Sequence, residues 1–313
     1  MKILANDGIS ASGKEALINT GHELLEVTVA QDQLINYINQ NNVDVLLVRS
    51  ATKVRKDIID ACPGLKIIGR GGVGMDNIDV DYARDKGITV INTPAASSQS
   101  VAELVMAHLY GMVRFLYDSN RQMPLDGESK FKELKKNYAA GIELQGKTLG
   151  IIGFGRIGQA LAKIALGIGM KVVQYDLYET PGEVSVTFFD GQSLTFSVPK
   201  LAFNELLKTS DFISLHVPGG DVIGAKEIEM MKDGAAIVNA SRGGVVNEDA
   251  LLDALNSGKL KYAALDVFAN EPTPAIKVLM NPHVSLSPHI GAATLEAQDR
   301  IGTELADLIN QHK

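Results

Sequence analysis

The chain has 313 residues, of which 45% are hydrophobic and 21% are charged, and its formal net charge is −7 at pH 7. This length allows about two domains, each with a buried core. The acidic balance argues against a protein that binds nucleic acids or membrane surfaces non-specifically. Cys62 is the only cysteine, which excludes an intramolecular disulfide and a thiolate metal cluster and fits a reducing compartment.

Neither the N-terminus nor any hydrophobic run indicates export or membrane insertion. The first residues, MKILANDGIS, become polar after four positions and lack the apolar core of a signal peptide. No stretch approaches the roughly 18 apolar residues expected of a membrane-spanning helix. We therefore expect a cytoplasmic protein with no membrane or nucleic-acid partner and no metal.

The first third of the chain alternates short apolar runs with amphipathic ones. The apolar runs predict strands at residues 2–6, 23–28, 43–48, 65–69 and 88–92. Nearly continuous apolar strands separated by helices are typical of a parallel sheet that is covered on both faces. A first α/β domain is therefore expected over residues 1–95.

A second series of strands follows a long helix, expected over 100–117, and a lysine-rich segment at 130–141. Its strands are predicted at residues 147–153, 171–176, 211–217, 235–240, 262–267 and 283–288. A last helix, at about 294–311, has no strand after it. Because the first domain lacks a closing helix, we expect this helix to pack back onto it. The expected domains are thus 1–95 plus 290–313, and 96–289.

One segment interrupts the alternation of strands and helices. Residues 183–198 read EVSVTFFDGQSLTFSV, with alternating apolar residues on either side of Asp190-Gly191. An Asp-Gly pair between two such runs indicates a β-hairpin. We interpret the segment as an inserted hairpin whose role the sequence does not reveal.

A glycine pattern in the second domain points to a dinucleotide. The stretch GIIGFGRIG places Gly153, Gly155 and Gly158 in G-x-G-x-x-G spacing between an apolar strand and an amphipathic helix. Such glycines permit a tight turn, close approach of a pyrophosphate and close packing of helix on strand. Asp176 ends the next strand, 18 residues beyond Gly158, and no Arg or Lys follows it in LYETPGE. This pattern favours NAD over NADP, because a carboxylate binds the ribose hydroxyls and repels a 2′-phosphate.

Three later segments each follow a predicted strand of the second domain. They read NASRGG (239–244), ALDVFANEP (264–272) and SPHIGA (287–292). Since the carboxyl ends of parallel strands border the ligand crevice, their polar side chains should converge there. Taken singly, each of these side chains is more often structural than catalytic.

Together these side chains suit hydride transfer between a nicotinamide and a 2-hydroxy acid. Arg242 offers a planar, permanently charged fork to a substrate carboxylate. His289, as an imidazole, can accept and return the hydroxyl proton near neutral pH. Glu271 would bond the other ring nitrogen, and Asp266 would hold the nicotinamide carboxamide or ribose.

With these motifs the chain resembles the D-isomer-specific 2-hydroxyacid dehydrogenase family along nearly its whole length. The resemblance implies two Rossmann- or flavodoxin-like doubly wound parallel-sheet domains with a cleft between them, a homodimer, NAD as cofactor, and a catalytic triad at Arg242, Glu271 and His289. The other cofactor-binding positions that it implies, beside the three glycines and Asp176, are Arg156, Ile157, His216, Val217, Pro218, Ala240, Ser241, Asp266, Gly291, Ala292 and Val101.

Within that family the first domain is most similar to the D-3-phosphoglycerate dehydrogenases. The similar stretches are LLVRSATKV (46–54), GRGGVGMDNID (69–79) and INTPAASSQSVAEL (91–104). The implied substrate-binding residues, besides Arg242 and His289, are Arg49, Ser50, Lys53, Arg70, Gly72, Val73 and Gly74. The cations would face a substrate phosphate, and the glycine-rich backbone would form an anion nest. By composition alone, the same cluster is as well explained as a solvated surface.

The function expected from this resemblance is oxidation of 3-phospho-D-glycerate to 3-phosphohydroxypyruvate with NAD, the first step of serine biosynthesis. Alternatives within the family are a glyoxylate/hydroxypyruvate reductase and a D-lactate dehydrogenase. An NAD-sensing corepressor or redox sensor, or a nucleotide-binding scaffold without chemistry, would be non-enzymatic alternatives. The chain ends directly after its last expected helix, so we expect no serine-sensing regulatory domain.

Overall fold

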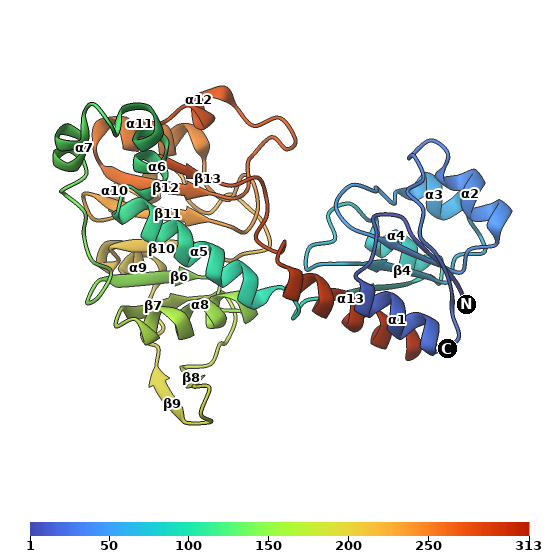
Figure 1. Cartoon of the computed structure of the whole chain (residues 1–313). Coiled ribbons are helices and arrows are strands. Elements are labelled where there is room, and N and C mark those ends of the chain that lie inside the picture. Colours follow the sequence, from blue (N-terminus) through green and yellow to red (C-terminus); the bar gives the residue numbers. More distant parts are fainter. Residues whose placement is uncertain (313) are drawn as a thin grey trace. The chain divides into compact units, whose positions relative to one another are not determined.

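The computed structural model describes residues 1–312, which form two compact units. Unit 1 comprises Met1–Ser100 and the chain from Ala292 onward, and unit 2 comprises Val101–Gly291. The chain therefore crosses between the units twice, after Ser100 and after Gly291. Figure 1 follows both units along the chain.

Unit 1 is built on a five-stranded sheet in which every strand pair is parallel. Its strands are β1 (Lys2–Ala5), β2 (Glu23–Leu25), β3 (Val45–Val48), β4 (Ile67–Arg70) and β5 (Thr89–Asn92). Their order across the sheet is β2-β1-β3-β4-β5, which is the flavodoxin-like arrangement. In such a sheet, ligands bind beyond the carboxyl ends of the strands where the order reverses, here between β1 and β3.

Helices cover both faces of this sheet. They are α1 (Ala11–Asn19), α2 (Leu34–Asn41), α3 (Lys56–Ala61), α4 (Val80–Asp85) and the C-terminal α13 (Leu295–Asn310). One hydrophobic cluster joins strand residues such as Ile3 and Val45 to Ile301 and Leu305 of α13, while a second lies beneath α2 and α3.

Helices α1 and α13 pack side by side (Figure 1). They approach each other closely at Gly13 and Gly302. A Cβ atom added at Gly13 would lie 2.6 Å from the Cα atom of Gly302, so neither position accommodates a side chain without moving the other helix. Polar contacts lie on either side of the glycines. Ser12 Oγ donates to Asp299 Oδ1 at 2.9 Å, and His22, which follows α1, has its Nε2 2.9 Å from Asn310 Oδ1.

Unit 2 contains a six-stranded parallel sheet in the order β13-β12-β11-β10-β6-β7. The strands are β6 (Thr148–Ile152), β7 (Lys171–Tyr175), β10 (Phe212–Leu215), β11 (Ala235–Asn239), β12 (Leu260–Leu265) and β13 (Val284–Leu286). The helices that connect and cover them are α8 (Arg156–Gly167), α9 (Phe203–Thr209), α10 (Ala225–Met230), α11 (Glu248–Ser257) and α12 (Ile276–Leu279). The order reverses between β6 and β10, which makes their carboxyl ends the place for a ligand.

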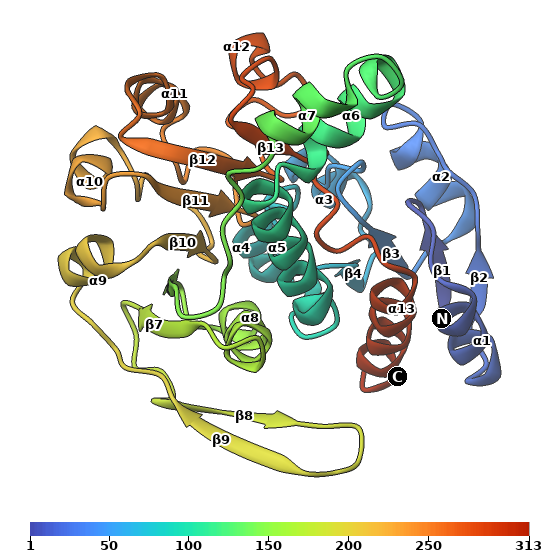
Figure 2. The same ribbon diagram turned by 60° about the vertical axis from the view of Figure 1, so that its left-hand side comes forward.

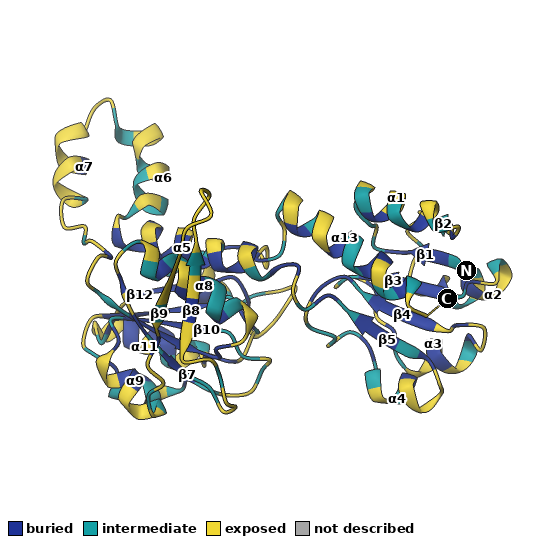
Figure 3. Ribbon diagram, turned by 90° about the horizontal axis from the view of Figure 1, so that it is seen from below, coloured by how far each residue is buried: buried dark blue, intermediate teal, exposed yellow. Residues whose placement is uncertain are grey.

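The long helix expected over 100–117 is shorter than predicted. Helix α5 spans Ser98–Val113, and Phe115 then adopts a left-handed backbone with φ of 54°. A left-handed residue cannot continue a right-handed helix, so a separate helix, α6 (Leu116–Asp126), begins there. The lysine-rich segment forms a further short helix, α7 (Phe131–Asn137). Figure 3 shows that α6 and α7 are largely exposed, in contrast to the buried strands of both sheets.

The predicted hairpin is confirmed. Strands β8 (Glu183–Thr187) and β9 (Ser193–Ser197) pair antiparallel around Asp190-Gly191, with Gly191 at φ of 87°. Val184 anchors the hairpin in the core beside α8, whereas Phe189 at its tip is fully exposed. Figure 2 shows the hairpin extending from the rest of unit 2.

Within residues 1–312, no helix is long and apolar enough to cross a bilayer. The same residues bring together no group of three or more His, Cys, Asp and Glu side chains that could hold a metal ion.

Candidate dinucleotide and catalytic site

The glycine loop lies between β6 and α8, at the point where the order of the strands reverses. Gly153 has φ of 90°, and a Cβ atom there would lie 2.4 Å from the carbonyl oxygen of His216, which follows β10. A Cβ atom at Gly158 would lie 2.4 Å from the carbonyl oxygen of Gly153. Gly155 instead has no atom within 4 Å of its Cβ position. Two glycines therefore permit close packing, and the middle one leaves the loop open to a ligand.

The residues around this loop fit a dinucleotide. Helix α8 has Gly155 as its N-cap and no side-chain cap, so its first N–H groups are available to an anion. Within the described residues His216 Nδ1 is buried without a partner, while its Nε2 lies 2.9 Å from Ser214 Oγ. Burial lowers the pKa of His216 to about 4, so the ring is neutral at physiological pH.

Asp176 takes part in the loop itself. Its Oδ2 atom accepts a hydrogen bond from the backbone N–H of Phe154 at 2.7 Å, and its Oδ1 accepts from Tyr178 at 2.9 Å. The carboxylate thus fixes the turn between the first two glycines, and each of its oxygens retains a lone pair for a ribose hydroxyl.

Glu271 and His289 are joined by a side-chain hydrogen bond in unit 2. His289 Nδ1 lies 2.8 Å from Glu271 Oε2, and Glu271 Oε1 accepts a hydrogen bond from the backbone N–H of Phe268 at 3.0 Å. Because a carboxylate only accepts hydrogen bonds, it fixes the proton on Nδ1 and leaves Nε2 as the basic nitrogen. A pocket of about 390 Å³ adjoins the pair, lined largely by prolines, leucines and Phe268.

His289 has an unusual backbone that Asp266 holds in place. The φ angle of His289 is 55°, a left-handed conformation that is uncommon outside glycine. Asp266, which is 1% exposed, accepts hydrogen bonds from the N–H groups of Ile290 and Gly291, both at 2.9 Å. Both of its oxygens therefore support the loop that carries His289. The sequence predicted only that Asp266 would hold the nicotinamide carboxamide or ribose.

The turn that carries Arg242 packs beside the segment that carries Glu271. Asn239 organises this turn: its Oδ1 accepts from the N–H and hydroxyl of Ser241, and its Nδ2 donates to the carbonyl of Arg242. A Cβ atom at Gly243 would lie 1.8 Å from the carbonyl oxygen of Phe268, so the two backbones are in direct contact. The segments of Arg242, Glu271 and His289 therefore adjoin one another within unit 2.

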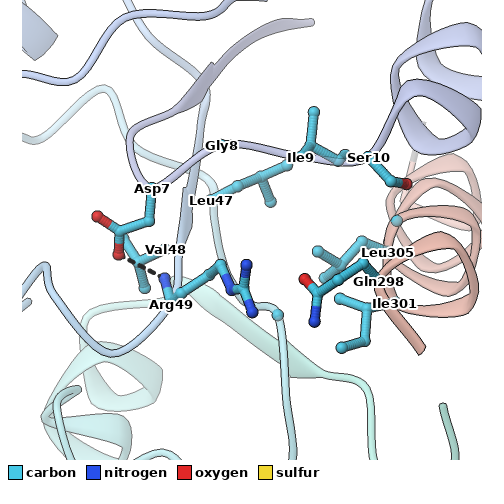
Figure 4. Close-up of a pocket in the computed structure, with 12 residues that line it drawn as sticks. Asp7, Gly8, Ile9, Ser10, Leu47, Val48, Arg49, Gln298, Ile301 and Leu305 are labelled. Carbon is cyan, nitrogen blue, oxygen red and sulfur yellow. Dashed lines mark hydrogen bonds between the residues drawn. The ribbon is translucent and has the colours of Figure 1, made fainter. Parts of the chain in front are cut away.

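Unit 1 has a pocket of its own at the carboxyl ends of β1, β3 and β4. Its volume is about 270 Å³, and Figure 4 shows Arg49 and Gln298 among the side chains that line it. Asp7 fixes the loop after β3 by accepting from the N–H groups of Arg49 and Thr52 at 2.6 and 3.1 Å. Within residues 1–312 the Arg49 guanidinium forms no ion pair or hydrogen bond, so it can receive an anion.

The structure brings together some of the predicted substrate residues of unit 1 and not others. Of the predicted residues, Arg49 lines the pocket, beside Gly71, which was not predicted. The Arg70 guanidinium lies so close to Gly72 that a Cβ atom there would meet it at 1.9 Å. Lys53 does not line the pocket; its backbone is bonded to Gln31 and its side chain is exposed. Sequence reasoning missed Asp7 and Gln298, since neither belongs to a recognisable motif.

Comparison with known proteins is consistent with this arrangement. The family model described as "D-isomer specific 2-hydroxyacid dehydrogenase, NAD binding domain" matches residues 106–291. The chain belongs to this family. It binds NAD, as the matched domain does, and it is an NAD-dependent oxidoreductase with two Rossmann-like parallel-sheet domains, as the sequence predicted.

Two relatives illustrate the family. The chain is 44% identical to hydroxypyruvate reductase of Thermotoga maritima, covering 98% of this chain and 97% of the relative. It is 42% identical to D-3-phosphoglycerate dehydrogenase of Methanocaldococcus jannaschii, covering 99% of this chain but only 57% of that relative. Among solved structures, a glyoxylate reductase from Paecilomyes thermophila superposes with a TM-score of 0.83 at 30% identity, covering 99% of this chain and 94% of the other.

Proposed function

We propose that this protein interconverts a D-2-hydroxy acid and its 2-oxo acid, with His289 as the acid/base. The observation that carries the proposal is the 2.8 Å contact between His289 Nδ1 and Glu271 Oε2, which leaves Nε2 as the basic nitrogen. NAD supplies the hydride acceptor or, when reduced, the hydride donor. Residues that would hold it are the open Gly155, the N-terminus of α8, His216 and Asp176.

In this mechanism the three side chains of unit 2 divide the work. His289 Nε2 removes the hydroxyl proton during oxidation and returns it during reduction. Glu271 keeps the imidazole oriented and stabilises its positive charge after it takes the proton. Arg242 binds the substrate carboxylate with its guanidinium, which fixes C2 relative to the transferred hydride.

We further propose that the substrate is 3-phospho-D-glycerate and its oxidised form, 3-phosphohydroxypyruvate, so that the enzyme would open serine biosynthesis in the cytoplasm. The support lies in unit 1, where Arg49 lines a pocket at the switch point of the sheet and its guanidinium has no hydrogen bond or ion pair to residues 1–312. The planar guanidinium of an arginine can bind a phosphate through two parallel hydrogen bonds. Arg70 and the backbone around Gly72 would extend the anion site.

A second candidate substrate is hydroxypyruvate, which lacks the phosphate. It is favoured by the match to the Thermotoga maritima hydroxypyruvate reductase, which covers 97% of that relative. The two candidates differ in whether the cations of unit 1 contribute to catalytic efficiency.

The test is a nicotinamide-absorbance assay with a panel of 2-oxo acids, comparing 3-phosphohydroxypyruvate, hydroxypyruvate, glyoxylate and pyruvate. We expect the highest kcat/KM with 3-phosphohydroxypyruvate, and Arg49→Gln should lower that value by about tenfold or more while sparing the other three. Arg55→Gln is the matched control, because Arg55 is already paired with Asp79 at 2.9 Å. Preference for hydroxypyruvate in the unaltered chain would favour the second candidate, and NAD binding without turnover would favour a sensor.

We also propose that the enzyme is a homodimer. Support comes from the hydrophobic side chains exposed on or beside α6 and α7, including Leu116, Leu125 and Phe131. Light scattering on the purified protein should give twice the mass of the chain, whereas a monomer at micromolar concentration would contradict this assembly.

A further inference from the structure

A buried chain of hydrogen bonds connects helix α5 to the loop of His289. It begins at His108 on α5, whose ring lies between two serines: Nδ1 is 2.8 Å from Ser285 Oγ and Nε2 is 2.9 Å from Ser287 Oγ. Ser287 then donates to Asp266 Oδ1 at 2.6 Å. His108, Ser285 and Ser287 are 6%, 7% and 8% exposed, so the chain lies inside unit 2.

The protons along this chain have only one consistent arrangement. Ser287 has a single hydroxyl hydrogen, and it goes to Asp266, which as a carboxylate can only accept. Ser287 must therefore accept from His108, so His108 carries its proton on Nε2. Burial is the main reason that the pKa of His108 is lowered, against the opposing charge of Asp266, so the ring is neutral and Nδ1 accepts from Ser285.

The chain ends at the backbone on the C-terminal side of His289. Asp266 accepts from Ile290 and Gly291, the two residues that follow the left-handed His289. A Cβ atom at Gly291 would lie 3.1 Å from Asp266 Oδ2 and 3.3 Å from Val101, so little space remains for the loop to shift. A strained backbone of this kind persists only where its surroundings hold it.

We propose that His108 is a positioning residue which, through Ser287 and Asp266, fixes the backbone that aims His289 at the substrate. This inference rests on the proposed role of His289 as the acid/base. His108 touches neither Glu271 nor His289 in any hydrogen bond of the described chain, so its effect passes through Asp266. The donor at Nε2 orients Ser287, which in turn gives Asp266 its third hydrogen-bond donor.

The two serines provide a matched pair of variants for the test. Both bond the same imidazole and are equally buried, but only Ser287 links it to Asp266. We expect Ser287→Ala to lower kcat by about tenfold or more with little change in KM, because a small misplacement of an acid/base group has a large kinetic effect. Ser285→Ala should remain within about twofold of the unaltered enzyme.

Variants of His108 test the origin of the effect. His108→Phe, which fills the volume without donating, should reproduce the Ser287→Ala loss, and the double variant should show no further loss. His108→Gln, whose amide nitrogen can donate from the position of Nε2, should recover most of kcat. Equal effects of Ser285→Ala and Ser287→Ala, or additive losses in the double variant, would overturn the proposal.

Amide hydrogen exchange gives a second measurement that does not depend on turnover. The N–H groups of Ile290 and Gly291 should exchange faster in Ser287→Ala and His108→Phe, and at the unaltered rate in Ser285→Ala. If the enzyme turns over no 2-oxo acid, the proposed function fails, yet exchange still decides whether this chain of bonds holds the loop. Unchanged exchange in all three variants would refute the positioning role alone.

Discussion

At the residue scale, His289 and Glu271 carry the proposed chemistry in a shared geometry. Glu271 uses one oxygen for the backbone of Phe268 and the other for the imidazole, so its position is fixed from two sides. This arrangement resists rotation of either side chain and gives the imidazole one tautomer. Loss of the imidazole should therefore lower kcat more than loss of the Glu271 charge does.

We predict that His289→Ala lowers kcat by about a hundredfold to ten-thousandfold, the usual contribution of general acid–base catalysis. Glu271→Gln, which keeps a hydrogen-bond acceptor but loses the charge, should lower kcat by about tenfold. The dissociation constant of NADH, measured by fluorescence, should stay near that of the unaltered enzyme in both variants. Full turnover in His289→Ala would exclude its role as the acid/base.

His216 gives a prediction about stability and pH. Burial lowers its folded-state pKa to about 4, whereas an unfolded histidine has a pKa of about 6.5. Between these values the unfolded chain binds more protons, so the free energy of unfolding should decrease as the pH falls from about 6.5 towards 4.

His216→Gln removes this difference in proton binding, so its stability should depend less on pH in that window. Urea unfolding at several pH values between 7 and 4.5 measures both slopes. Because the carboxylates titrate in both proteins, only the difference between the two slopes reports on His216. Identical slopes would mean that folding does not lower the pKa of His216.

At the scale of single elements, the loop between β6 and α8 contains two glycines that permit close packing and one, Gly155, that we propose admits the cofactor. Gly155 has no atom within 4 Å of its Cβ position and a negative φ, so Gly155→Ala should fold normally. The added methyl group would occupy the space in which a pyrophosphate approaches the loop. We predict an NAD dissociation constant raised by about tenfold or more with an unchanged melting temperature, measured by calorimetry. Gly167→Ala in the same helix, also with open space, is the control.

The crossing of α1 and α13 gives a prediction about stability alone. Gly13→Ala places a methyl group 2.6 Å from the Gly302 Cα atom and should lower the free energy of unfolding by about 1–3 kcal/mol. Gly111→Ala, inside α5 with nothing within 4 Å, should instead be neutral or gain up to about 1 kcal/mol in helix propensity. Chemical denaturation of both variants compares them directly. A stable Gly13→Ala variant would show that the two helices can separate without loss.

Some elements could be predicted from the sequence and others could not. Apolar runs in a parallel sheet are buried on both faces, so each predicted strand appears close to its expected place. The end of α5 could not be predicted, because the apolar periodicity continues through Phe115 and only the left-handed backbone interrupts it. The glycine fingerprint and the three strand-end segments were recognisable because their residue types are specific to their chemistry.

The parts of the site that no motif marks were not predictable. His108 lies among apolar residues of α5, and Ser285 and Ser287 alternate on β13 and just beyond it. Their hydrogen bonds depend on how a helix and a strand separated by more than 170 residues of sequence meet in unit 2. A sequence pattern carries no signal for such a meeting. The same holds for Asp7 and Gln298 in unit 1.

At the scale of the whole molecule, the two passages of the chain between the units lie next to each other. Val101, which opens unit 2, lies against Gly291, which closes it. Unit 2 is thus one continuous segment inserted into the sequence of unit 1. The two units can therefore be expressed as separate polypeptides. A polypeptide of residues 101–291 should fold alone, melt cooperatively and retain NAD. A short flexible linker from Ser100 to Ala292 should allow unit 1 to fold as a separate protein. Each half could then be titrated with its own ligand.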